Sequence, residues 1–284
     1  MNSENWSVRQ STKRDRGIVS TLLHTADKKH HHLDWLEPYD ILDEKPFILG
    51  FKQDILTACM ACPPETPQNA WMRIFAIQGS NSIQKAWDKL WPIVLNRLEH
   101  LGLNSLAVLA LPRWLEELLV AANFIETNNV IFYEWNSGDL PSVARMTGTL
   151  RGIRPSDLET IHQLDTRAFS YLWQNSPAEL NEALKQCTLA TAFESEGKIL
   201  GYQFSTASAW GGHLARLAVE PEFQGQGVGT ALVTDLIRQL SRRGFQRITV
   251  NTQGDNVMSH RLYRKLGFKE TGDRYPVYEY LLSD

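Results

Sequence analysis

The sequence predicts an α/β (α+β) protein that contains two copies of one domain. An apolar strand that ends at Val219 is followed by three glycines and by a helix with apolar side chains at helical spacing as far as Leu240. A similar order of strands and helices recurs in both halves of the chain. Ile77 and Val219 end equivalent strands 142 residues apart, and Gly102 and Gly244 are separated by the same 142 residues. An offset near half the chain length indicates a duplicated domain.

Composition excludes several classes of protein. The chain has 284 residues, of which 43% are hydrophobic and 21% charged, so a large core can form. The net charge of −3 gives no basic footprint for a nucleic acid and argues against a membrane-surface protein. Apolar runs are too short to span a bilayer, the N-terminus lacks a signal-peptide core, and three cysteines make no disulfide scaffold. These features predict a location in the reducing cytoplasm.

The first half is expected to begin with a loose polar segment of about 16 residues. The elements predicted after it are a hairpin over 46–51 and 54–59, a strand over 71–77, a helix over 83–100 kinked at Pro92, a strand over 106–111, a helix over 112–122 and a strand over 129–135. A segment rich in Gly, Ser, Asp and Pro over 136–146 predicts a linker. The expected domains are therefore 1–145 and 146–284.

Two motifs in the first half suggest metal or redox chemistry, and neither is supported by its surroundings. His30, His31 and His32 lack carboxylate or cysteine partners at ligand spacing, so a solvated loop or helix end is the expected setting. Cys59 and Cys62 form a single CxxC, which is followed by two prolines instead of a helix. We expect strand cysteines and no metal site.

The second half begins with a strand over 147–153 and two helices. Capping boxes at Ser156 with Glu159 and at Ser176 with Glu179 mark the expected helix starts. The elements predicted after these helices are a hairpin over 189–193 and 199–206, the central strand to Val219, the helix to Leu240, a strand over 247–251 and a helix from about 256 to 266.

The glycine-rich turn between the central strand and its helix is a candidate phosphate site. Glycine permits close approach to the backbone, and a helix N-terminus offers N–H groups and a positive dipole end. A Rossmann fingerprint would need a third glycine where Thr230 stands, and a P-loop would need a lysine that is absent.

Residues 224–229 resemble the Q/R-x-x-G-x-G/A signature of the GNAT superfamily of N-acetyltransferases through Gln224, Gly227 and Gly229. The segment from Asn256 to Phe268 is similar to the second signature of that family, N-x-x-A-x-x-L-Y-x-x-x-G-F, with Ser in place of the usual Ala. The resemblance extends from about residue 147 to the C-terminus. It implies a mixed, mostly antiparallel sheet with helices on both faces, in which the strands ending near 219 and 251 are parallel and splay apart.

The resemblance also implies acetyl-CoA as co-substrate, with direct attack of an amine on the thioester. The residues expected to bind it are Leu217, Ala218, Val219, Gln224, Gly225, Gln226, Gly227, Val228, Gly229, Thr230, Asn251, Asn256 and Ser259. Tyr263 is the expected general acid for the leaving thiolate. His213 is expected to share a strand face with residues 215, 217 and 219 and is the leading candidate base; Glu220 and water remain alternatives.

The two copies are not equivalent in these residues. At the offset of 142, Lys85 and Trp87 stand in place of Gly227 and Gly229, and at 144 Leu119 stands in place of Tyr263. We therefore expect a degenerate first copy and an N-acetyltransferase in the second, acting on a primary amine of a small molecule or a protein. The alternative is a non-catalytic acyl-CoA sensor or scaffold. The sequence leaves the acceptor and the oligomeric state open.

Overall fold

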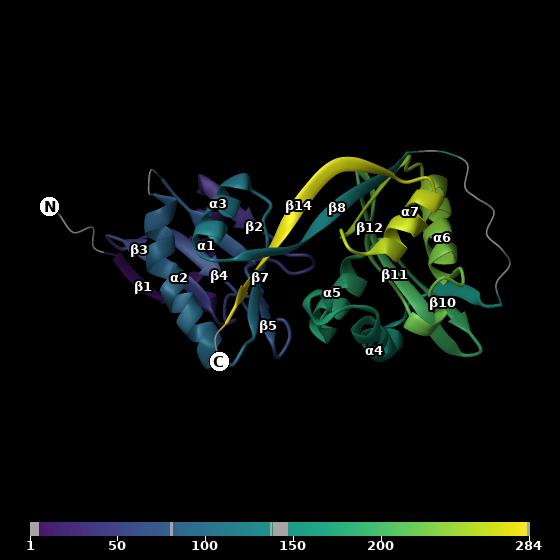
Figure 1. Cartoon of the computed structure of the whole chain (residues 1–284), viewed down its shortest axis with the longest axis horizontal. Coiled ribbons are helices and arrows are strands. Elements are labelled where there is room, and N and C mark those ends of the chain that lie inside the picture. The colour runs from purple at the N-terminus through teal and green to yellow at the C-terminus, as the bar shows by residue number, and fades with distance from the viewer. Residues whose placement is uncertain (1–5, 80–81, 137, 139–146, 283–284) are drawn as a thin grey trace. The chain divides into compact units, whose positions relative to one another are not determined.

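The chain folds into two compact units, seen in a computed structural model that describes residues 6–79, 82–136, 138 and 147–282 (Figure 1). Unit 1 comprises Met1–Thr127 and Tyr275–Asp284, and unit 2 comprises Asn128–Arg274. These units differ from the expected domains 1–145 and 146–284, because each contains a strand from the other copy. Most of the predicted linker, residues 137 and 139–146, lies outside the described residues.

Unit 2 contains a mixed, mostly antiparallel sheet, as predicted. Its strands lie in the order β9 (Thr149–Gly152), β10 (Leu189–Ser195), β11 (Lys198–Ser208), β12 (Gly211–Val219), β13 (Arg247–Gln253) and β8 (Ile125–Asn136). Its helices are α4 (Leu158–Ala168), α5 (Pro177–Gln186), α6 (Val228–Arg242) and α7 (Val257–Lys265). The pairing of β12 with β13 is parallel and the other pairings of this sheet are antiparallel.

Helices cover both faces of this sheet. A Cβ atom added to Gly201 of β11 would lie 2.9 Å from Val228 of α6, so Gly201 faces α6. The next residue, Tyr202, hydrogen-bonds through its hydroxyl to Asp165 of α4. Because successive side chains of a strand point to opposite faces, α6 and α4 lie on opposite faces of the sheet.

The parallel pair splays apart, as predicted. Pairing runs from Gly212–Ile248 to Leu214–Val250, whereas the two strands continue to Val219 and Gln253. The backbone of β12 beyond Leu214 therefore leaves the ladder it shares with β13.

A bulge in β12 contradicts the expectation that residues 213, 215, 217 and 219 share one face. Phe204 pairs with Arg216 and Ser205 with Leu214, so Ala215 is the extra residue. The bulge places His213 on the same face as Arg216, the face toward α4, while Leu217 and Val219 face the other way. One unpaired residue is enough to reverse the alternation of side chains.

Helix starts in unit 2 follow the predicted capping in part. The Ser176 box is present: its Oγ accepts from the Glu179 N–H at 3.2 Å, and α5 follows. The Ser156 box is wrong, because a short 3₁₀ turn over Pro155–Asp157 precedes α4 and Asp157 accepts from the Arg154 N–H at 2.7 Å.

Unit 1 contains a five-stranded sheet in the order β1 (Trp6–Gln10), β3 (Phe47–Lys52), β4 (Ile55–Ala61), β6 (Ile74–Ile77) and β2 (Lys28–His31). A second set of strands consists of β5 (Asn69–Trp71), β7 (Ser105–Leu109) and the end of β14 (Lys269–Leu281). The helices are α1 (Arg16–Thr25), α2 (Ile83–His100) and α3 (Arg113–Ala121). The bounds of α2 are those predicted from its apolar periodicity.

Three expectations for the first half are wrong. The loose polar lead-in contains strand β1, and the single strand expected over 71–77 is two strands, β5 and β6. The histidine run is not a solvated loop throughout: His30 and His31 lie in β2, and His30 is fully buried and contacts the Met72 carbonyl through Nε2 at 3.0 Å. Burial lowers the pKa of His30 to about 3.

Strand registers confirm the duplication. In unit 1, β5 and β7 are parallel with Ala70 opposite Leu106, and in unit 2 the pair at the offset of 142 is Gly212 opposite Ile248. The neighbouring strand is exchanged between the copies. Leu109 pairs with Val277 of β14, and its counterpart Asn251 pairs with Phe132 of β8. Each copy thus gives its last strand to the sheet of the other unit.

Candidate active site

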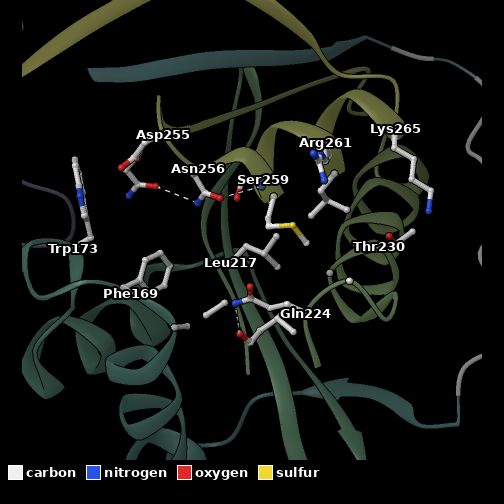
Figure 2. A pocket seen from close by; sticks show the side chains of 18 of the residues that line it. Phe169, Trp173, Leu217, Gln224, Thr230, Asp255, Asn256, Ser259, Arg261 and Lys265 are labelled. Atoms are coloured by element: carbon white, nitrogen blue, oxygen red, sulfur yellow. Dashed lines mark hydrogen bonds between the residues drawn. The ribbon is translucent and has the colours of Figure 1, made fainter. Parts of the chain in front are cut away.

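A cavity of about 550 Å³ opens in unit 2 where β12 leaves β13. Its walls come from the end of β12, the glycine turn, α7 with the loop before it, and the segment between α4 and α5 (Figure 2). The predicted cofactor residues that line it are Leu217, Ala218, Val219, Gln224, Gly225, Gly227, Gly229, Thr230, Asn256 and Ser259. Gln226, Val228 and Asn251 are not among the lining residues, and Val228 is 1% exposed in the core.

The glycine turn presents the N-terminus of α6 to this cavity. Gly225 and Gly227 have φ angles of 74° and 101°, in the region that favours glycine, and α6 begins at Val228. Gln224 Nε2 donates to the Val219 carbonyl at 3.1 Å and so braces the turn against β12. The first N–H groups of a helix have no partner within it, so this terminus suits an anion.

Two basic side chains of α7 also line the cavity, and sequence reasoning missed them. Arg261 and Lys265 are exposed and are drawn on the same side of the cavity as Thr230 (Figure 2). Their i, i+4 spacing places both on one face of a helix, which was the signal available in the sequence. Together with the α6 N-terminus they make this end of the cavity cationic.

The opposite end of the cavity is aromatic and acidic, and this too was missed. Phe169 and Trp173 lie there with Asp255 above them (Figure 2). Phe169 packs on the guanidinium of Arg216, whose Cζ lies 3.6 Å from the ring centroid. The Trp173 carbonyl accepts from Arg216 Nη2 at 2.7 Å. Arg216, which does not itself line the cavity, therefore fixes the positions of both Phe169 and Trp173.

Arg216 belongs to a buried polar network on the face of the sheet toward α4. Its Nε and Nη2 donate to the two Asp165 carboxylate oxygens at 2.8 and 2.7 Å. The Tyr202 hydroxyl donates to the same carboxylate, and burial raises the pKa of Tyr202 well above its ordinary value. Removing one partner of such a buried pair would leave an uncompensated charge, so the network favours a single arrangement of the α4–α5 segment.

Tyr263 lies behind the cavity wall. It is 3% exposed and packs between the rings of Tyr133 and Phe268, and it is not among the lining residues. Burial raises the pKa of the phenol above its ordinary value, and a hydrogen bond with the Ser259 side chain opposes that shift in part. Because Ser259 lines the cavity, it connects the phenol to the cavity.

The two candidate bases do not line the cavity. His213 Nδ1 lies 2.9 Å from the Thr249 hydroxyl, in the middle of the paired region of β12 and β13. Glu220 accepts from Arg167 Nε at 3.1 Å, in an ion pair at the surface. The structure thus places the glycine turn and Ser259 in the lining of one cavity, whereas the candidate bases His213 and Glu220 lie outside that lining.

Within residues 6–79, 82–136, 138 and 147–282, no cluster of three or more His, Cys, Asp or Glu side chains is arranged to hold a metal ion. Among the helices formed by these residues, none has the length and apolar character needed to cross a membrane.

Most of unit 2 resembles known acetyltransferases. Residues 158–268 match the family model described as "Acetyltransferase (GNAT) family". The chain is 26% identical over 130 residues to the [ribosomal protein bS18]-alanine N-acetyltransferase of Escherichia coli K12, covering 46% of this chain and 86% of that protein. It is 27% identical over 162 residues to the mycothiol acetyltransferase of Saccharomonospora viridis, covering 50% of this chain and about half, 52%, of that protein.

The whole chain also has a structural counterpart. A tandem GNAT protein from the clavulanic acid biosynthesis pathway superposes with a TM-score of 0.70 at 13% identity, covering 99% of both chains. At that identity the likeness shows the fold alone, which is two tandem GNAT folds. Residues 158–268 therefore match the GNAT acetyltransferase family model, and the chain as a whole has the fold of a tandem GNAT protein.

Proposed function

We propose that this chain is an acetyl-CoA-dependent N-acetyltransferase whose unit 2 moves an acetyl group directly to a primary amine. The observation that carries the proposal is the single cavity that joins the α6 N-terminus to the splayed strands. One end offers N–H groups and cations to a diphosphate, and the middle offers backbone of β12 that β13 no longer pairs. The two relatives, named for acetylating an alanine of a ribosomal protein and mycothiol, support this class of reaction.

In the proposed complex the diphosphate lies at the first turn of α6, with Arg261 and Lys265 at its side. The pantetheine arm runs along Leu217, Ala218 and Val219. The acetyl group then lies between the glycine end and the aromatic end, within reach of an amine from the side of Phe169. These assignments follow the lining of the cavity and the direction of β12.

The chemistry requires one bond to form, one to break and two proton movements. The amine nitrogen attacks the acetyl carbonyl carbon, the carbon–sulfur bond breaks, and the thiolate takes a proton. We assign that proton to Tyr263, with the Ser259 hydroxyl between the phenol and the cavity. The amine gives up its proton to a base or to solvent.

The function is tested by incubating the full chain with acetyl-CoA and a library of amines, with thiol release as readout and mass spectrometry of the products. We expect amine-dependent thiol release with an added acetyl group on nitrogen. Tight acetyl-CoA binding without transfer to any amine would instead identify a sensor or scaffold.

The base is tested by His213→Ala. If His213 accepts the amine proton, the variant should lose most activity at low pH and least at high pH, where more of the acceptor is already neutral. The acidic limb of the kcat/KM profile should then move. If the acidic limb of the kcat/KM profile stays in place and only the melting temperature falls, His213 is structural and water is the base. The position of His213 outside the cavity lining favours this second outcome.

We propose that unit 1 binds no coenzyme A, because the strand edge equivalent to the open edge of β12 is occupied and the glycine turn is not present. Strand β6, equivalent at the offset of 142 to residues 216–219, pairs with β4 on one edge and with β2 on the other. The extra strand β2 thus occupies the edge that β12 leaves open in unit 2. Trp87, in place of Gly229, is 4% exposed and stacks on Trp91 at 5.2 Å. Asp88 stands where unit 2 has Thr230, which would repel a phosphate.

A further inference from the structure

The cavity of unit 2 has opposite charge at its two ends. Among its lining residues, the cations Arg261 and Lys265 lie at the end with Thr230, whereas the carboxylate of Asp255 lies at the end with Phe169 and Trp173 (Figure 2). If the cationic end takes the phosphates of the cofactor, the acidic and aromatic end is left for the acceptor. This assignment rests on the proposed function.

Two arginines close in sequence or contact to the aromatic residues of the acceptor end are already engaged. Arg216 donates to both Asp165 oxygens and to the Trp173 carbonyl, and its flat face covers Phe169. Arg167 is paired with Glu220. Neither guanidinium lines the cavity, so among the lining residues at this end no cationic side chain faces an acceptor.

The Asp255 carboxylate is carried on a fixed loop. The preceding Gly254 carbonyl contacts His260 Nε2 at 3.0 Å, and His260 Nδ1 lies 2.8 Å from the Tyr133 hydroxyl. On the other side, Asn256 caps α7 by accepting from the Ser259 N–H at 3.0 Å. The residues on both sides of Asp255 are therefore held by side-chain hydrogen bonds, which keeps the carboxylate at the rim of the cavity.

These features favour an ammonium group and disfavour a carboxylate. The Asp255 carboxylate attracts an ammonium group and repels a carboxylate. The Trp173 ring can add to the attraction, whereas one face of Phe169 is already covered by Arg216. We propose that the acceptor is an amine with no carboxylate beside it, such as the N-terminus of a peptide, which binds as an ammonium ion and loses one proton to solvent before it attacks, and that free α-amino acids are rejected. Asp255, Phe169 and Trp173 are the residues that set this specificity.

The test compares pairs of acceptors that differ only in the α-carboxylate. One member of each pair is a free amino acid such as alanine, serine or lysine, and the other is the corresponding amino acid amide. The full chain is assayed with saturating acetyl-CoA, and kcat/KM is corrected for the fraction of neutral amine at the assay pH. We expect the amides to be preferred by about 10-fold or more, an order of magnitude suited to one charge contact. The difference should appear mainly in KM.

Asp255→Asn should reduce this preference several-fold and leave acetyl-CoA affinity unchanged. Asp273→Asn is the matched control, because Asp273 is also exposed in unit 2 and is not a lining residue. Equal use of acids and amides, or acetyl-CoA binding without turnover of any amide, would overturn the inference. Failure to bind acetyl-CoA in calorimetry would instead remove the proposed function itself.

Discussion

Gly227→Glu should abolish measurable acetyl-CoA binding in calorimetry. Gly227 is the residue immediately before α6 and has a φ of 101°, which non-glycine residues rarely adopt. A glutamate there would place a carboxylate at the positive end of the helix, where it would compete with the diphosphate for the same N–H groups. The glutamate side chain would both block the diphosphate sterically and repel it, so we expect a larger loss of acetyl-CoA affinity than removal of a single contact would cause.

Gly244→Glu is the matched control for this change. Gly244 follows α6, has a φ of 90°, and a Cβ added to it would meet nothing within 4 Å. Both variants carry the same new charge and a left-handed backbone cost of about 1–2 kcal/mol. Both should therefore lower the melting temperature similarly, while Gly244→Glu keeps its acetyl-CoA affinity. Unchanged affinity in Gly227→Glu would remove the phosphate site from the glycine turn.

Tyr263→Phe should lower kcat by about 100-fold or more, the usual contribution of a general acid. The ring keeps its contacts with Tyr133 and Phe268, so folding and acetyl-CoA affinity should change little. Because burial raises the pKa of the phenol, it remains protonated throughout the neutral range. The wild-type rate should therefore show no alkaline loss attributable to this group up to pH ~10, the ordinary value of a phenol.

Stopped thiol-release assays across pH measure both effects. Tyr278→Phe provides the control, since it removes the hydroxyl of another buried tyrosine, in unit 1. Full turnover by Tyr263→Phe would show that another group or solvent protonates the thiolate.

The parts of the fold that sequence analysis predicted well are those determined locally. The bounds of α2 and the start of α6 follow from apolar periodicity and from glycine positions. The errors concern pairing between distant segments. Nothing in the histidine run shows that β2 pairs with β6, and nothing near Ala215 marks it as a bulge. Register depends on partners that a local pattern does not contain.

The same distinction applies to the site. The glycine turn and the cap at Asn256 are short contiguous patterns, and residues of both line the cavity. The acidic and aromatic end is assembled from two segments, around Phe169 and Asp255, which are 86 residues apart. The aromatic run between α4 and α5 was visible in the sequence, but only the fold brings it beside the loop that precedes α7.

The exchange of last strands makes each unit depend on the other copy of the domain. Strand β8 of the first copy pairs with β13 in unit 2, and β14 of the second copy pairs with β7 in unit 1. Two identical single-domain chains that exchanged the same strand would form a symmetric domain-swapped dimer. In this chain both exchanged strands belong to one polypeptide, so the first copy contributes a strand to the sheet of unit 2 whether or not it has any chemistry of its own.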